Sequence, residues 1–276
     1  MSASRLEAVT TQLAQAGECG IAPYVTAGDG GLERTLAVLQ ALEEAGAACV
    51  ELGLPFSDPV ADGPLLQAAA LRSLEAGTTF EGVVDLIARY RSAGGALPIL
   101  AFSYANPILS RGAEEACSRL AGAGADGLLI PDLPVEEQTC IAGAVQAADL
   151  ASVFFVTPTT ADARIVRAAE LSRGFLYVIG RTGITGTRTE LGREGSEFLA
   201  RVRSLTTCPL GVGFGINGPA EVAAVAPHAQ LAIVGSALVE HVHQAALAAA
   251  PDQDSDAVSA RAAAHFLTHL REGLKP

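Results

Sequence analysis

The segment Val50–Pro64 reads VELGLPFSDPVADGP and indicates a buried strand that runs into a functional loop. Apolar residues alternate along 48–53, as in a strand with one face in a core, yet Glu51 stands in its interior. A charged side chain is almost never buried in a strand without a partner or a role. Asp62 lies in the turn before the next helix. Two carboxylates at a strand end and in the following loop suit acid–base chemistry.

A structural explanation competes for Asp62. An aspartate just before a helix commonly satisfies the free backbone N–H groups of the first turn. From the residues alone, a capping role and a functional role both remain open for Asp62. Glu51 has no comparable structural explanation, because it lies within the strand.

Composition limits the class of partner. The chain has 276 residues, of which 50% are hydrophobic, enough for one large α/β domain or two small ones. Its 18 Lys and Arg face 30 Asp and Glu, giving a net charge of −12, which argues against nucleic acid or an anionic membrane as the main partner. An anionic substrate would therefore need local binding groups.

Cysteines and termini indicate a cytoplasmic protein. The cysteines are odd in number and scattered, which predicts free, buried thiols in a reducing compartment. They are Cys19, Cys49, Cys117, Cys140 and Cys208. The N-terminus lacks the basic start and apolar block of a signal peptide, and no run approaches the ~18 apolar residues of a membrane span.

No metal site is predicted. The cysteines lack zinc spacing, and two histidine pairs, His241 with His243 and His265 with His269, have no acidic third ligand at a suitable spacing. Surface or packing roles are expected for these histidines.

Eight predicted strands alternate with helical patterns along the chain. They are 20–26, 48–53, 98–102, 125–130, 151–156, 174–179, 209–214 and 231–234. This alternation, without a shift in composition, predicts a single (β/α)₈ TIM barrel domain over residues 1–276, with an extra N-terminal helix at 3–16 and a C-terminal helix after a loop at 251–259. A doubly wound sheet is the alternative, but no GxGxxG follows the first strand.

Two connections carry specific predictions. Thr78 and Glu81 form a capping-box pattern at the start of a helix, and 103–107 is rich in turn residues. The segment 180–195 is rich in Gly, Thr and Arg, and we expect a long loop there.

In such a barrel the active site lies at the C-terminal ends of the strands. The polar candidates there are Glu51, Asp62, Tyr104, Asp132, Tyr177 and Thr185. Glycine-bearing turns at 183–186, 213–216 and 235–236 lie in the last loops, where backbone amides and a helix N-terminus can hold a phosphate. A single glycine turn is weak evidence, since glycines also end strands for steric reasons. Three in these loops favour a phosphate site.

Four motifs resemble one known family. They are YVTAGD at 24–29, ELGLPFSDPVADGP at 51–64, IPDLP at 130–134 and GFGI at 213–216. Together they resemble the tryptophan synthase α subunit over nearly the whole chain. The resemblance implies a (β/α)₈ barrel that cleaves indole-3-glycerol phosphate to indole and glyceraldehyde 3-phosphate in L-tryptophan biosynthesis. It also implies an α₂β₂ heterotetramer, in which a β subunit takes the indole and carries the pyridoxal phosphate, with no cofactor in this chain.

The resemblance also assigns residues. It implies catalytic roles for Glu51 and Asp62, and substrate contacts by Tyr177 and by Thr185, which packs on Asp62. It implies that the loops of Tyr104 and Asp132 lie toward the β subunit. The phosphate-binding amides it implies are those of Gly186, Gly215, Gly235 and Ser236.

Retro-aldol cleavage requires a proton at indole C3, positive charge on the indole nitrogen and loss of the hydroxyl proton. We expect Glu51 to move these protons and to titrate high, and Asp62 to remain ionised beside the indole N–H and to titrate low. A stand-alone lyase that releases free indole and a non-catalytic activator of a β-like enzyme are the alternatives.

Overall fold

The structure, a computed structural model, describes residues 4–180, 193–213 and 215–275, and its strands form one parallel sheet. The strands are β1 (Gly20–Thr26), β2 (Val50–Gly53), β3 (Ile99–Phe102), β4 (Gly127–Leu129), β5 (Ala151–Val153), β6 (Phe155–Val156), β7 (Leu176–Ile179), β8 (Leu210–Gly213) and β9 (Leu231–Val234). Their order is β5-β4-β3-β2-β1-β9-β8-β7-β6.

The sheet closes through its fifth strand. β5 and β6 stand at opposite ends of the sheet order, yet only Phe154 separates them in the chain. β5 pairs with β4, and β6 pairs with β7. The two short strands are therefore halves of the strand predicted at 151–156, and the sheet is the predicted eight-stranded barrel.

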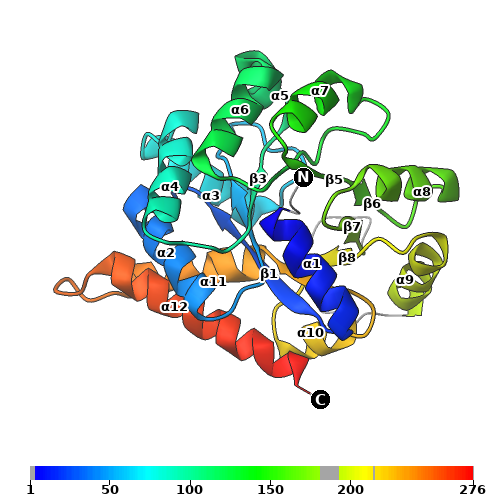
Figure 1. Cartoon of the computed structure of the whole chain (residues 1–276). Coiled ribbons are helices and arrows are strands. Elements are labelled where there is room, and N and C mark those ends of the chain that lie inside the picture. Colours follow the sequence, from blue (N-terminus) through cyan, green and yellow to red (C-terminus); the bar gives the residue numbers. More distant parts are fainter. Residues whose placement is uncertain (1–3, 181–192, 214, 276) are drawn as a thin grey trace.

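Helices surround the barrel (Figure 1). They are α1 (Arg5–Ala16), α2 (Leu32–Glu44), α3 (Pro64–Glu75), α4 (Phe80–Ser92), α5 (Ala105–Arg111), α6 (Ala113–Ala123), α7 (Thr139–Ala147), α8 (Asp162–Leu171), α9 (Arg193–Leu205), α10 (Pro219–Val225), α11 (Ser236–Leu247) and α12 (Ser255–Leu270), followed by a 3₁₀ turn η1 (Arg271–Leu274). The C-terminal helix α12 packs on α2 and α11. Among the described helices, none combines the length and the apolar character needed to cross a bilayer.

Strand alternation divides the core into two layers. Val50 and Leu52 of β2 belong to the layer between strands and helices. Cys49 belongs to a second cluster inside the barrel, together with Leu100 and Phe175. Glu51 is two residues after Cys49 in the strand, and residues at this spacing point to the same face. The side chain of Glu51 therefore lies on the inner face of the barrel.

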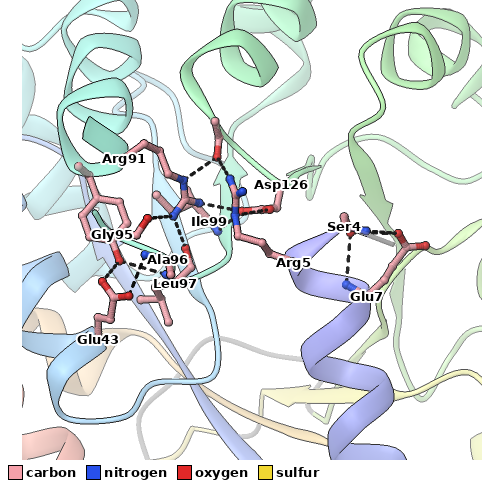
Figure 2. Close-up of polar contacts among 12 residues, drawn as sticks. Ser4, Arg5, Glu7, Glu43, Arg91, Gly95, Ala96, Leu97, Ile99 and Asp126 are labelled. Carbon is pink, nitrogen blue, oxygen red and sulfur yellow. Dashed lines mark hydrogen bonds and ion pairs between the residues drawn. The ribbon is translucent and has the colours of Figure 1, made fainter. Parts of the chain in front are cut away.

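The N-terminal helix α1 covers the N-terminal end of the barrel, as Figure 1 shows. Leu6 is fully buried within the interior cluster. Arg5 contacts the buried Asp126 at 3.1 Å, and Arg91 of α4 contacts the same carboxylate at 2.8 Å. Figure 2 shows the contacts of both guanidinium groups with Asp126. The helix is therefore held by apolar burial and by a buried ion-paired carboxylate.

Two predicted boundaries were wrong. Thr79, not Thr78, is the N-cap of α4, and its hydroxyl accepts from the N–H of Gly82 at 3.1 Å. Thr78 is buried instead, against Gly28. The loop predicted at 251–259 ends early, because the side chain of Asp254 caps α12 by accepting from two backbone N–H groups.

The segment predicted as a turn at 103–107 enters helix α5. Pro107 falls in its first turn, where the missing N–H has no intrahelical partner to lose. Most of the loop predicted at 180–195 lies outside the described residues, and α9 begins at Arg193.

All five cysteines are free, as predicted, but their burial varies. Cys49 and Cys117 are buried, and Cys19 and Cys208 are partly buried. Cys140 is exposed, because the buried face of α7 is formed by Ile141, Ala144 and Val145. The expectation of burial was therefore wrong for Cys140.

Candidate active site

Glu51 is a buried carboxyl inside the barrel. Its backbone pairs with Tyr24 of β1 and Leu100 of β3, and the residue is 1% exposed. Its Oε1 has no hydrogen-bond partner among the described residues. Burial raises the pKa of Glu51 to about 8, which confirms the expectation that it titrates high. A proton on this group is therefore available near neutral pH.

Tyr24 lies beside Glu51, and sequence reasoning assigned it no role. A methyl group added to Gly53 would stand 2.0 Å from the Tyr24 hydroxyl oxygen, so the phenol lies over the end of β2. The ring packs edge-on against Phe102, with centroids 5.3 Å apart. The alternation of β1, which turns Ala22 and Tyr24 to the interior, was the signal that could have identified it.

Asp62 lies in the loop between β2 and α3 and is partly buried. The N-cap of α3 is Gly63, and no side chain caps this helix. The capping interpretation of Asp62 is therefore wrong. The N–H of the preceding Ala61 donates to the Tyr104 hydroxyl at 3.2 Å, which places this loop beside the end of β3.

The pKa of Asp62 departs from the prediction. Burial raises it to about 6, and a hydrogen bond with Tyr104 opposes the rise. The expectation of a low pKa was wrong for the ligand-free protein, because desolvation outweighs this single donor. Asp62 is still mostly ionised at pH 7, whereas Glu51 is mostly protonated.

Tyr177 brings the third predicted side chain to the same place. It lies on β7 and packs against Phe155, with ring centroids 4.6 Å apart. Burial, and then the charges of Glu51 and Asp62, raise the pKa of Tyr177 well above its usual value. The two carboxyls and this phenol therefore converge at the barrel's C-terminal mouth.

Of the predicted glycine turns, 235–236 lies wholly within the described residues, and 213–216 does so except for Phe214. Gly235 is the N-cap of α11, and Ser236 is its first residue. A methyl group added to Gly235 would stand 3.7 Å from Cβ of Tyr24, so this helix start adjoins the Glu51 pocket. Gly215 follows β8 with φ +69° and is exposed.

Three other predictions concern loops and metals. Thr185 and Gly186 lie outside the described residues. Asp132 is exposed, and its Oδ1 accepts from the N–H of Ala105 at 2.9 Å, which ties the loops after β3 and β4 together. Among the described residues, no group of three or more His, Cys, Asp and Glu has a metal-binding arrangement.

The fold and the site define a class. The C-terminal mouth of this (β/α)₈ barrel holds a protonated buried carboxyl, an ionised carboxylate and a phenol. These groups are typical of the active site of an enzyme that transfers protons. One carboxyl can donate a proton while the other stabilises positive charge.

Comparison with known proteins gives the family. Residues 10–268 match the family described as tryptophan synthase alpha chain. The chain is 43% identical to the tryptophan synthase alpha chain of Chloroflexus aurantiacus over 241 residues, covering 87% of this chain and 91% of the relative. It is 44% identical to that of Gloeobacter violaceus over 246 residues, covering 89% of each. The chain belongs to the tryptophan synthase alpha chain family, and it is a lyase of the tryptophan biosynthetic pathway.

Solved structures agree. The tryptophan synthase subunit alpha of Legionella pneumophila superposes with a TM-score of 0.86 at 30% identity, covering 99% of each chain. A chain of Mycobacterium tuberculosis tryptophan synthase superposes with a TM-score of 0.86 at 29% identity, covering 100% of each.

Proposed function

We propose that this chain cleaves indole-3-glycerol phosphate to indole and glyceraldehyde 3-phosphate by a retro-aldol reaction, with Glu51 and Asp62 as its catalytic residues. The observation that carries the proposal is the Glu51 carboxyl, buried with Oε1 unpartnered among the described residues and protonated near neutral pH, in the same mouth as an ionised Asp62. Family membership supports the reaction class.

Glu51 performs both proton transfers. Its protonated carboxyl donates to indole C3, which breaks the aromaticity of the five-membered ring and places positive charge on the nitrogen. The resulting carboxylate then accepts the proton of the adjacent glycerol hydroxyl. As the hydroxyl oxygen becomes the aldehyde oxygen, the bond between indole C3 and the glycerol carbon breaks. The electron pair of that bond returns to the ring and restores the neutral, aromatic indole. Glu51 ends protonated, so the cycle consumes no proton.

Asp62 stabilises the charge that develops between these transfers. An ionised carboxylate beside the indole N–H is a preorganised acceptor for a nitrogen that becomes cationic. Its position near Tyr104 and Tyr177, and outside any capping role, supports this assignment. A substrate N–H would add a donor that the ligand-free protein lacks, and would lower the pKa of Asp62.

Backbone amides hold the phosphate at the far end of the substrate. Gly235 and Ser236 open α11, a helix of 12 residues, whose dipole and free N–H groups attract an anion. Gly215 lies after the neighbouring strand β8. The resemblance adds Gly186 to this set and places Thr185 and Tyr177 against the substrate.

The same proposal covers partner, cofactor and compartment. The chain acts with a tryptophan synthase β subunit in an α₂β₂ assembly, and the pyridoxal phosphate belongs to that subunit. Its own reaction needs no cofactor, because two carboxyls supply every proton transfer described above. It acts in the cytoplasm. The relatives named tryptophan synthase alpha chain support this arrangement.

One experiment tests the proposal. The purified chain is incubated with indole-3-glycerol phosphate, with and without a β subunit, and indole and glyceraldehyde 3-phosphate are measured. An α subunit forms both products slowly alone and faster with the partner. A rate that the partner leaves unchanged identifies a stand-alone lyase. No product in either case, together with stimulation of the β subunit, identifies a non-catalytic activator and contradicts the proposal.

A further inference from the structure

Tyr104 lies between the loop that carries Asp62 and the loop after β4 that carries Asp132. It follows β3 directly, is the N-cap residue of α5 and is 2% exposed. Its ring packs against Phe56 and Phe102, with centroid separations of 5.6 and 6.4 Å. The next residue, Ala105, donates its N–H to Asp132 at 2.9 Å. Both the ring and its backbone are therefore held by core packing and by the loop after β4.

The Tyr104 hydroxyl makes a specific contact with the loop that carries Asp62. It accepts a hydrogen bond from the N–H of Ala61 at 3.2 Å. A phenol oxygen that accepts from a backbone N–H keeps its own proton for another acceptor. The Asp62 carboxylate lies next along the chain from Ala61, and its interaction with the Tyr104 hydroxyl lowers the pKa of Asp62 against the larger effect of burial.

We propose that Tyr104 is the positioning residue for Asp62: its hydroxyl fixes the backbone at Ala61 and offers its proton to the carboxylate, so that the Asp62 side chain is held toward the site. This proposal rests on the catalytic role proposed for Asp62. Tyr104 acts through Asp62 and not on the reacting atoms. The sequence placed Tyr104 among the polar candidates at the mouth, and the resemblance placed its loop toward the partner subunit, but neither revealed this contact.

Among the described residues, few titratable groups other than Tyr104 lie close enough to Asp62 to change its pKa. Asp62 shares the mouth with Glu51 of β2, Tyr24 of β1 and Tyr177 of β7, besides Tyr104. Glu51 is neutral below about pH 8, and burial raises the pKa of each phenol, so all three neighbours are uncharged near pH 6. A change in Asp62 titration after loss of the Tyr104 hydroxyl therefore reports on that hydroxyl.

The test is Tyr104→Phe, which keeps the ring and removes the donor. The pKa of the Asp62 carboxyl, followed by ¹³C NMR, is expected to rise by about 1 from about 6. With that rise, kcat/KM for indole-3-glycerol phosphate falls about fivefold more at pH 6 than at pH 8, because the ionised fraction of Asp62 falls mainly at the lower pH. Full-length protein with its β subunit is used, and folding is checked by circular dichroism.

Tyr90→Phe is the matched control. Tyr90 is fully buried, its hydroxyl accepts from the N–H of Leu97 at 3.2 Å and donates to the carboxylate of Glu43. It is therefore the same arrangement of phenol, backbone N–H and carboxylate, but it lies outside the proposed site, on α4. This variant is expected to keep the Asp62 pKa and the wild-type pH profile.

The outcomes separate this proposal from the proposed function. An unchanged Asp62 pKa in Tyr104→Phe, or an activity loss equal at pH 6 and pH 8, overturns the role of Tyr104. Asp62→Asn is assayed in parallel: if it keeps wild-type turnover, the catalytic role of Asp62 fails instead. The NMR titration does not depend on activity, so it distinguishes the two failures.

Discussion

Replacing Glu51 with glutamine is expected to stabilise the fold at neutral and alkaline pH while it removes activity. Burial raises the pKa of Glu51 from 4.5 to about 8. A carboxyl with a raised pKa in the folded state gives its full stability below pH 4.5, where both states are protonated. That stability is lost as pH rises toward 8, because the unfolded chain ionises and the folded chain cannot do so without cost.

The magnitude follows from about 1.4 kcal/mol for each pH unit between the two pKa values. At pH 7 the folded protein is about 3 kcal/mol less stable than it would be with a neutral side chain, and above pH 8 the difference approaches about 5 kcal/mol. Glutamine has nearly the same shape and no charge to desolvate. Glu51→Gln should therefore gain about 3 kcal/mol at pH 7 and nothing near pH 4.

Urea unfolding followed by far-ultraviolet circular dichroism at pH 4, 7 and 8.5 measures this difference. The chain has no tryptophan, so backbone signal is the better probe. Glu33→Gln is the matched control, because Glu33 is exposed and its hydrogen bonds with Arg89 lower its pKa. A stability difference for Glu51→Gln that does not grow with pH would refute a buried carboxyl with a raised pKa.

Two further predictions concern the pH dependence of activity and the ion pairs of Asp126 at the N-terminal end of the barrel. The profile of kcat/KM against pH should rise with an apparent pKa near 6, as Asp62 ionises, and fall with one near 8, as Glu51 loses its proton; a profile that is flat across this interval contradicts the assignment. Asp126→Asn should destabilise the protein by about 3 kcal/mol in urea unfolding, because it leaves the partly buried Arg91 without its charged partner, whereas Arg89→Ala at an exposed ion pair should change the midpoint little. Equal effects of the two changes would show that the buried cluster does not anchor α1.

Much of the fold was predictable because local patterns and barrel topology agree. The predicted strand 20–26 matches β1, and 231–234 matches β9, since each is a continuous apolar run between polar or glycine-bearing turns. Helix α5 was not predictable from Asn106 and Pro107, which favour turns, because a proline in the first helical turn costs little. At α4, two adjacent threonines compete for the cap, and burial against Gly28 decides which one stays inside.

The site was predictable where a residue violates its local pattern. Glu51 is conspicuous because a charge interrupts an apolar strand, and its high pKa follows from that burial. The raised pKa of Asp62 depends on how deeply its loop is covered, which no local pattern records. Tyr104 meets Ala61 across 43 residues of sequence, and only the folded barrel brings them together.

The central claim is that Glu51 carries the protons of the retro-aldol step, and its most direct test is turnover of indole-3-glycerol phosphate by Glu51→Gln with the β subunit present at pH 7. General acid–base catalysis is typically worth about 10²–10⁴-fold. The account predicts a loss in that range in a variant that remains folded and still binds the substrate. Turnover within about tenfold of wild type would contradict it.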